Sequence, residues 1–577
     1  MSLIQVIFKI QVINLKQTPT SAFDLSAHAP MTARALDMPG AGQDQSVVFQ
    51  FNDSSLDMSV SELDISIGSS GSPSPRSPRR LPVSSRGDND QRDWRRFLRK
   101  ADSDEEDVRE IIISDNIHGH IVVPKVCQAV IDTPQFDRLR GLRQLGSAHY
   151  VYPAAKHSRW EHSLGVMHLA GELVDRLSSV RPGCADDTDK VCVMLAGLCH
   201  DLGHGPFSHL WESFVREARN GYEWHHEQTS IAMLDYIIAD NNLMPIFKDH
   251  GLAEQDIMFV KELIYGPFQQ GSDDDNDGNW PYVGRGPEKY FLYEIVANKI
   301  SSVDVDKWDY MLRDDKAMNL GITFDYKKFI LNSGLMDVDG RTRMCVRDKE
   351  ADNVQDMFKD RARLHSKGYQ HRTILTIDRM ILDSLLAADP YFPLSNSSGE
   401  TMRLSEACDN IEVFSQLTDE YLIRSIQFSS DPRMIEAKDI VRRISKRELY
   451  KTVGHIECSG NQQISLDNAQ MNLQNIVGSD SRLDRNDMAI LRKRVTCGMG
   501  RKNPVEKVLF IDKRGKTRTF TSELLRKNLP RELSTVTYIF VVKKIDEESV
   551  KAATEIVRKM TMLYGESTIT NVQCPNN

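Results

Sequence analysis

The chain has 577 residues, of which 40% are hydrophobic and 27% charged, and its net charge is −9. A chain of this length exceeds one compact core, so two or more structural units are expected in an ordinary globular protein. The net charge excludes a protein that coats nucleic acid by bulk electrostatics, so any anionic ligand must be held by a local cluster of basic residues.

The cysteines and the N-terminus indicate the compartment. Nine cysteines without a CxxC pair favour free thiols in a reducing environment over a disulfide framework. The first stretch, MSLIQVIFKIQVINLK, is broken by Lys9 and shows neither a basic segment nor a small-residue cleavage site, so no secretory signal is expected. No stretch approaches the roughly 20 apolar residues of a membrane span. We expect a protein of the nucleus, with the cytoplasm as the alternative, and no membrane partner.

Residues 1–105 are expected to form a disordered tail. They are rich in Ser, Pro, Asp and Gly and cannot bury enough apolar surface to offset the entropy of ordering. Within the tail, SPRR at 77–80 has the form of a proline-directed kinase site, RRL at 79–81 is suited to a cyclin-type partner, and RDWRRFLRK at 92–100 is a basic cluster suited to nuclear import. A solvated tail with incidental charges is the alternative for each.

Residues 106–450 are expected to form a mainly α core. The segment IIISDNIHGHIVVP predicts a short hairpin, and IDTPQFDRLRGLRQLG predicts a helix that begins near Thr133-Pro134. A further helix is predicted over EHSLGVMHLAGELVDRL, because its apolar residues recur at helical spacing: Val166, Leu169, Ala170, Leu173, Val174 and Leu177. The acidic stretch GSDDDNDGN at 271–279 is predicted to be a loop.

Residues 451–577 are expected to form a smaller α/β lobe. The segments VEKVLFID and STVTYIFVVKK are β-branched or alternating, which is typical of strands. The segment ESVKAATEIVRKM, which follows the second of them, is predicted to be a helix.

A metal site is indicated by three separate stretches: HSRWEHS at 157–163, LCHDLGH at 198–204 and VDVDKWDYMLRD at 303–314. They supply two imidazoles and two carboxylates, a set suited to Fe, Zn or Mn with water in the open positions: His162, His200, Asp201 and Asp306. Adjacent helical residues point about 100° apart, so a His-Asp pair reaches one ion only from a helix end or a distorted turn. The glycines and proline of LGHGP are expected to end a helix there.

Each of these elements is weak alone, but the order H, HD and D is that of the HD phosphohydrolase superfamily. The chain resembles more closely the animal SAM-and-HD-domain deoxynucleoside triphosphate triphosphohydrolases. The resemblance covers about residues 108–565 through these segments: IHGHI, IDTPQFDRLRGLRQLG, HSRWEHSLGV, AGLCHDLGHGPFSH, HEQTS, FLYEIVANK, VDVDKWDY, RDKE and LHSKGYQH. Residues 1–105 show no helical bundle that resembles a SAM domain.

The resemblance implies metal-dependent hydrolysis of a dNTP to a deoxynucleoside and inorganic triphosphate. It assigns the four metal ligands above, and it makes His209 the general acid, with His204, Glu212 and His226 beside it. Glu212 stands where the family has an Asp. The positions implied to bind substrate, through the triphosphate or the deoxyribose, are Arg159, Lys307, Arg361, Gln144, Leu145, Tyr310, Asp314 and Tyr369.

The resemblance also implies activation by GTP, by dNTP and by Mg²⁺-bound nucleotide between the subunits of a homotetramer, with a regulatory role for residues 451–577. The matching positions are Ile112, Ser114, Asp132, Asp137, Arg140, Ile322, Lys328, Arg347, Lys349, His371, Arg372, Arg447, Lys451 and Lys513. Asp137 replaces a family Gln, which places an added negative charge beside anionic nucleotide. Ser114 replaces a family Asn, and Ile111 replaces a Lys. The alternative interpretation is that the basic residues of this set are ordinary surface charges in contact with solvent.

The leading hypothesis is a dNTP triphosphohydrolase that lowers cellular dNTP pools and thereby restricts viral replication. Two alternatives remain open. One keeps the HD chemistry on another nucleotide, and the density of triphosphate-matching basic residues argues against it. The other is a single-stranded nucleic-acid binding protein, which the net charge of −9 disfavours.

Overall fold

The computed structural model describes residues 110–268, 280–459, 465–498, 503–518, 534–564 and 571–573. The predicted tail, with its kinase, cyclin and import motifs, and the acidic loop at 271–279 lie outside these residues. The predictions made for them therefore stay predictions.

The predicted N-terminal hairpin is present. Strands β1 (Ile111–Asp115) and β2 (Gly119–Val123) pair antiparallel, with Ile111 opposite Val123. The Asp115 carboxylate accepts the backbone N–H groups of Ile117 and His118 in the turn, which Gly119 completes at a φ of +80°.

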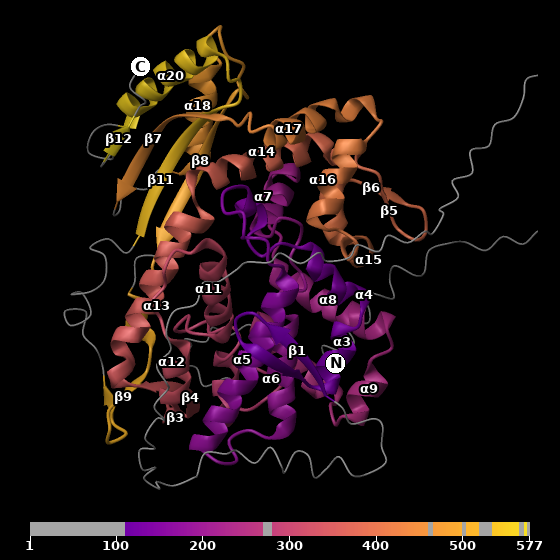
Figure 1. Ribbon diagram of the computed structural model, residues 1–577, viewed down its shortest axis with the longest axis vertical. Helices are drawn as coiled ribbons and strands as arrows, with labels where there is room; N and C mark the ends of the chain where they lie inside the picture. Colours follow the sequence, from indigo (N-terminus) through magenta and orange to yellow (C-terminus); the bar gives the residue numbers. More distant parts are fainter. Residues whose placement is uncertain are drawn as a thin grey trace, which may run out of the picture. The chain divides into compact units, whose positions relative to one another are not determined.

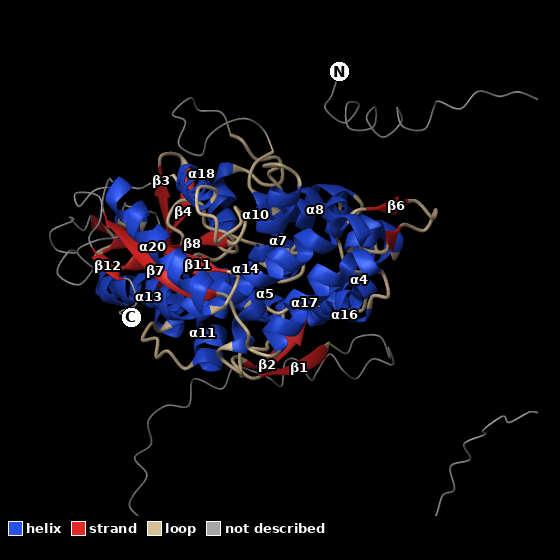
Figure 2. Ribbon diagram, turned by 90° about the horizontal axis from the view of Figure 1, so that it is seen from above, coloured by secondary structure: helices blue, strands red, loops and turns tan. Residues whose placement is uncertain are grey.

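Helices form most of the described chain, as Figures 1 and 2 show, and this confirms the mainly α prediction. In chain order they are α3 (Lys125–Ile131), α4 (Pro134–Asp137), α5 (Arg159–Val180), α6 (Asp187–Cys199), α7 (His209–Ala218), α8 (His226–Asp240), α9 (Met244–Asp249), α10 (Glu254–Tyr265), α11 (Val305–Met318), α12 (Tyr326–Asn332), α13 (Ala351–Arg363), α14 (Arg372–Ala388), α15 (Ile411–Phe414), α16 (Asp419–Phe428), α17 (Ile435–Ser445), α18 (Leu466–Val477) and α20 (Glu547–Tyr564). Among the described helices, none is long and apolar enough to cross a membrane.

Helix α5 lies at the centre of the main core. All six apolar positions predicted for its inner face are at most 1% exposed. Ser158 and Glu161 form a capping box that starts the helix. Glycine at 165 is required because a Cβ there would collide with the Asp309 carboxylate of α11, so the two helices approach closely at this point. The close approach brings residues of α5 and α11 into one site.

The helix predicted from Thr133-Pro134 begins there but is shorter than expected. Thr133 caps α4 by accepting the N–H of Phe136, and the chain then tightens into the 3₁₀-helix η1 (Arg138–Gly141). Gly141 lies against Thr418 with no room for a Cβ. Packing against a distant segment therefore ends a helix that the local pattern would have continued.

Most of the described strands after α12 belong to two four-stranded sheets. The first has the order β10-β9-β4-β3, from β3 (Ser333–Val338), β4 (Arg341–Arg347), β9 (Phe510–Ile511) and β10 (Thr517–Arg518). The second has the order β12-β7-β11-β8, from β7 (Lys451–Ser459), β8 (Met488–Thr496), β11 (Ser534–Val542) and β12 (Asn571–Gln573). A short pair, β5 (Leu394–Ser395) with β6 (Thr401–Met402), completes the described strands.

The second sheet has its own hydrophobic core, which it shares with α18 and α20. This agrees with the strand and helix predicted at STVTYIFVVKK and ESVKAATEIVRKM. The predicted strand VEKVLFID behaves differently, because only Phe510–Ile511 is extended and it pairs in parallel with β4 of the first sheet. The boundary predicted at residue 450 stays a prediction.

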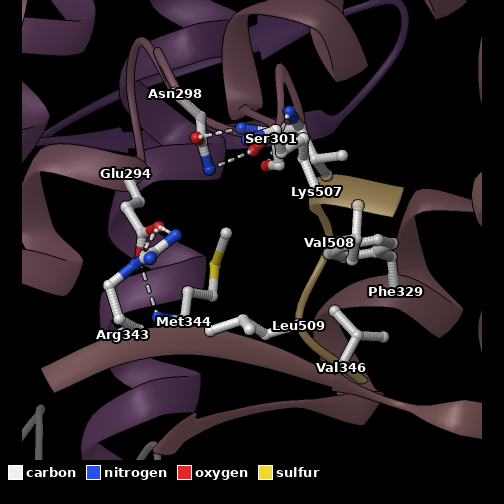
Figure 3. A pocket seen from close by; sticks show the side chains of 11 residues that line it. Glu294, Asn298, Ser301, Phe329, Arg343, Met344, Val346, Lys507, Val508 and Leu509 are labelled. Atoms are coloured by element: carbon white, nitrogen blue, oxygen red, sulfur yellow. Dashed lines mark hydrogen bonds and ion pairs between the residues drawn. The ribbon is translucent and has the colours of Figure 1, made fainter. Parts of the chain in front are cut away.

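A small cavity lies where residues 507–509 pack onto β4 (Figure 3). It measures about 250 Å³ including the solvent at its mouth, and Glu294 on its wall accepts hydrogen bonds from Arg343 Nε and Met344 N at 2.8 and 2.7 Å. No predicted site residue lines this cavity. Among the described residues the cysteines are all unpaired, as expected.

Candidate active site

The four predicted metal ligands converge from three helices. His162 comes from the first turn of α5, His200 caps the end of α6 with Asp201 directly after it, and Asp306 lies in the first turn of α11. His162 Nε2 lies 3.1 Å from Asp306 Oδ1 and 3.5 Å from Asp201 Oδ2. His200 Nε2 lies 3.4 Å from Asp201 Oδ1 and 3.5 Å from Asp306 Oδ1.

The donor set fits a divalent transition metal. His200 donates from Nδ1 to the Gly197 carbonyl at 2.8 Å, and its buried Nε2 has no hydrogen-bond partner among the described residues. An imidazole fixed in this way presents a lone pair to the cluster, as a metal ligand does. Ligand atoms of His162, His200 and Asp306 all lie within 4.8 Å of one another. Two neutral imidazoles and two carboxylates with open positions suit Fe, Zn or Mn.

The electrostatics of the cluster favour a cation. Burial lowers the pKa of His162, but hydrogen bonds to Asp306 and Asp309 outweigh it and raise the pKa to about 10. Burial raises the pKa of Asp306, but the hydrogen bond with His162 and the nearby charges of His162 and His200 outweigh it and lower the pKa. The carboxylates thus create a negative field around buried imidazoles, which is the field that a bound metal would neutralise.

Asp309 orients the ligand His162 and was not predicted from the sequence. Its Oδ2 accepts from His162 Nδ1 at 2.7 Å, while its Oδ1 accepts from His118 Nε2 at 2.7 Å. Arg313 donates to the same carboxylate and, at 2.9 Å, to Asp115 at the hairpin tip. Asp309 follows the ligand Asp306 by three residues in α11, so helical spacing alone places it on the same face.

The second predicted cluster surrounds Glu212. Its Oε1 accepts from His226 Nδ1 at 2.8 Å and lies 3.4 Å from His209 Nδ1. His204 stacks on His226 with ring centroids 3.8 Å apart, and its Nε2 lies 3.3 Å from Asp201. Burial raises the pKa of Glu212, but hydrogen bonds from His209 and His226 outweigh it and lower the pKa. Glutamate therefore orients two imidazoles, and it binds His226 more closely than the predicted partner His209.

His209 begins α7 and its side chain is exposed, whereas the residues before it in the motif are buried. The glycines of the motif allow this arrangement, because a Cβ at Gly203 would collide with the backbone of α8 and a Cβ at Gly205 with Trp211. The histidine-rich loop is thus pressed against α8 while His209 faces outward.

The basic residues predicted to hold the triphosphate lie around the two clusters. Arg159 donates from NH1 to Asp201 and from Nε to the Ser208 hydroxyl at 3.1 Å. Lys307 Nζ lies 3.1 Å from Asp304 Oδ2, and Arg361 donates to the Thr496 carbonyl at 3.2 Å. Buried atoms without a hydrogen-bond partner among the described residues include Arg361 Nε and Gln144 Oε1, and such atoms need a ligand or water.

His365 is a further member of the site that the sequence did not reveal. Burial, together with the charges of Arg361, His209 and Lys307, lowers its pKa to about 3. The His365 ring is therefore close to cations predicted to bind the triphosphate and to the predicted general acid. Its ring also lies 4.8 Å from that of Tyr369, within the π-helix η5 (Leu364–Tyr369). A π-helical turn is rare and frequently occurs at functional sites.

The sugar-facing residues form a connected group. Tyr369 donates its hydroxyl to Asp314 Oδ2 at 2.5 Å, and His157 Nε2 lies 2.8 Å from Asp314 Oδ1. Tyr310 lies near the metal cluster, with its ring 6.5 Å from that of His162. Leu145 is partly buried against the main core. His157 was quoted in the sequence motif without a role, and the structure shows that it fixes Asp314.

The positions matched to activator sites have a different character. Most are exposed, and Ile322, Arg347 and His371 are half-buried. Asp137 accepts from Arg140 Nε at 2.8 Å, and the Arg140 guanidinium stacks on Trp160 at 3.5 Å. The added charge at 137 is therefore paired within the chain.

The fold and the clusters define an HD-domain protein, and a family model described as "HD domain" matches residues 159–253. Human deoxynucleoside triphosphate triphosphohydrolase SAMHD1 is 40% identical over 453 residues, 77% of this chain and 72% of that protein. The Danio rerio SAMHD1 is 39% identical over 77% and 72% of the two chains, and a Dictyostelium discoideum homologue is 34% identical over 71% and 72%. The chain belongs to the SAMHD1 family of HD-domain hydrolases.

Proposed function

We propose that this protein hydrolyses dNTPs to deoxynucleosides and inorganic triphosphate at the site described above. The observation that carries the proposal is the meeting of three groups: a two-His, two-Asp cluster, a histidine group oriented by Glu212, and three basic residues. Beside them lie buried polar atoms that have no hydrogen-bond partner among the described residues. The relatives named as dNTP triphosphohydrolases support the same substrate class.

The residues divide the work by their chemistry. When bound at His162, His200, Asp201 and Asp306, a divalent metal polarises the phosphoryl group and acidifies water. Arg159, Lys307 and Arg361 neutralise the triphosphate, the arginines with forked donors and the lysine as a point charge. His209, held by Glu212, protonates the leaving 5′ oxygen.

Selection of deoxyribose is assigned to the group around Asp314. Its two carboxylate oxygens are already engaged by Tyr369 and His157, so both partners hold it rigidly. A tyrosine ring fixed against C2′ leaves no space for a 2′-hydroxyl. Tyr369 and Tyr310 therefore discriminate against ribonucleotides.

We assign regulation to nucleotide binding between subunits: GTP at a first site and dNTP at a second, with Mg²⁺, in a homotetramer. The exposure of most matched positions supports sites that a second chain completes. Nuclear location, lowering of dNTP pools, restriction of viruses and the partners of the tail, a kinase or a cyclin, rest on the resemblance and the tail motifs. Single-stranded nucleic acid is a further partner that rests on the resemblance alone.

The test is release of triphosphate from dATP by the purified full chain with Mg²⁺, with and without GTP, beside Asp306→Ala. Triphosphate and deoxyadenosine formed by the wild type only with GTP, and no product from the variant, would support both the chemistry and the activator site. Product without GTP would support the chemistry and overturn strict activation. No triphosphate from any dNTP would overturn the proposed reaction.

A further inference from the structure

A buried carboxylate outside the matched HD domain ties together two segments of the active site. Asp419, the first residue of α16, is 2% exposed. Its Oδ1 accepts the backbone N–H of Phe207 at 2.8 Å, and its Oδ2 accepts the backbone N–H of Arg143 at 3.0 Å. One side chain thus holds the turn that precedes His209 and the segment that precedes Gln144.

The turn before His209 has a strained backbone. Phe207 and Ser208 have φ values of +60° and +59°, a left-handed conformation that non-glycine residues rarely adopt. Such a backbone persists only when its surroundings fix it, and it is concentrated at functional sites. The hydrogen bond from Phe207 N to Asp419 is one of the contacts that fix it. His209 follows as the first residue of α7, so its position depends on this turn.

Ser208 makes a second contact between the turn before His209 and the segment before Gln144. Its hydroxyl donates to the Arg143 carbonyl at 3.0 Å and accepts from Arg159 Nε at 3.1 Å. Both backbone polar groups of Arg143 are therefore bound, one by Asp419 and one by Ser208. Gly146 packs closely on this turn, since a Cβ there would lie 3.1 Å from the Phe207 carbonyl oxygen, and its φ of +49° favours glycine. Residues 143–146 and 207–208 form one fixed unit.

The charge of Asp419 is retained by its surroundings. Burial raises its pKa, but the backbone amides of Phe207 and Arg143 and the charges of Arg143 and Arg159 oppose this and hold the pKa at about 6. Arg138 also faces this carboxylate and is 6% exposed. It donates to the Leu417 carbonyl at 2.9 Å and the His204 carbonyl at 2.8 Å. Arg138 therefore links the loop before α16 to the histidine-rich motif, beside the direct contact between Asp419 and Phe207.

We propose that Asp419 is a positioning residue for hydrolysis, because it fixes the general acid His209 relative to the sugar-facing residues Gln144 and Leu145. The inference rests on the proposed function. Since Asp419 touches neither the metal cluster nor Lys307 and Arg361 in any described contact, its loss should misplace the proton donor more than it weakens triphosphate binding. We therefore expect the substitution to lower kcat and to leave KM nearly unchanged.

The test is Asp419→Asn, which keeps the shape of the side chain but turns one amide donor toward a backbone N–H. We expect kcat for dATP to fall about 10- to 100-fold, because misplacing a catalytic group by about 1 Å has an effect of this size. KM should change less than about threefold, by the same argument. Hydrogen exchange of the peptide spanning residues 203–213 should accelerate, with α5 unchanged.

The matched control is Glu262→Gln. Glu262 is 1% exposed and accepts the backbone N–H groups of Val283 and Gly284 at 2.6 and 2.8 Å, so it makes the same kind of bridge away from the site. We expect it to lower the melting temperature without lowering kcat. Should Asp419→Asn prove insoluble, Ser208→Ala removes the other half of the connection and should likewise lower kcat and accelerate hydrogen exchange at residues 203–213. Because Ser208 also binds Arg159, hydrogen exchange rather than KM is the criterion for this variant.

Unchanged kcat for Asp419→Asn would overturn the proposal, as would equal losses of kcat in Asp419→Asn and Glu262→Gln, which would indicate general destabilisation. If the wild type itself released no triphosphate, the proposed function would fail, and hydrogen exchange at residues 203–213 would still decide whether Asp419 fixes the turn. Unchanged exchange there would refute the connection independently of activity.

Discussion

The metal cluster and the surface matched to activator binding differ in how much of their environment one chain supplies. Three of the four predicted ligands have a partner outside the cluster: His162 is bound by Asp309, His200 by Gly197, and Asp201 by Arg159. On the activator surface, the side chains of Lys349, Lys451 and Lys513 are exposed to solvent. The fold of one chain therefore fixes the side chains of the cluster, whereas it leaves most residues matched to activator binding exposed.

Removal of a cluster ligand should have the largest effect. Asp306→Ala removes one of the two carboxylates, and loss of several kcal/mol of charge stabilisation corresponds to a fall in kcat/KM of roughly 10³-fold or more. Bound metal measured by elemental analysis should fall with it. Normal metal content with normal activity would exclude Asp306 as a ligand.

Weakening the hydrogen bond that orients a predicted metal ligand should lower activity less than removing the ligand. Asp309→Asn weakens the hydrogen bond to His162 Nδ1, and we expect metal affinity to fall about 10- to 100-fold in a chelator competition. Asp175→Asn on the same helix as His162 is the control, because Asp175 is exposed and pairs only with Lys190 in the described contacts. Equal affinities in the two variants would contradict the role of Asp309.

The preference for deoxyribose over ribose should weaken more when the ring of Tyr369 is removed than when only its hydroxyl is removed. Tyr369→Ala removes the ring and should raise GTP hydrolysis relative to dGTP by about 10- to 100-fold, the range that steric exclusion of one hydroxyl gives. Tyr369→Phe keeps the ring and loses only the hydrogen bond to Asp314, so it should change the ratio less. Measured ratios that do not differ from the wild type would assign the tyrosine to packing alone.

A substitution on the exposed surface matched to activator binding should change activation by GTP only slightly. Asp137→Gln removes a charge that is paired with Arg140 at the surface, where salt screens it, so the GTP concentration for half-activation should fall only about two- to fivefold. The titration should be done at two ionic strengths. A larger shift that persists at high salt would show that residue 137 is buried when nucleotide binds.

A half-buried carboxylate outside the cluster, Asp378, gives a test on stability. Burial raises the pKa of Asp378 to about 7, although the Ser147 hydroxyl donates to it and lowers the pKa. The folded state then holds a proton that the unfolded state releases above about pH 4, so this group's contribution to stability falls as pH rises to 7. Asp378→Asn should remove that dependence. The difference in melting temperature between the variant and the wild type should be more positive at pH 8 than at pH 5. The reverse order would contradict a raised pKa of Asp378 in the folded state.

Much of the site could be predicted because its chemistry is local in the sequence. His200 and Asp201 are adjacent, Glu212 and His209 lie one helical turn apart, and glycines mark the loop between them. Asp309 was missed although helical spacing from Asp306 would have found it. His365 and His157 could not be assigned, because a single histidine carries no signal until its neighbours are known.

The sequence by itself determined the mainly α fold, the hairpin, the inner face of α5 and the candidate metal ligands that the fold brings together, because periodicity, turn residues and donor chemistry are local properties. Only the tertiary structure decided where α4 ends, which sheet Phe510–Ile511 joins, and that Asp419 holds the turn before His209. Each of these depends on a contact between residues far apart in the chain, and burial and hydrogen bonding across such distances arise only when the core has formed.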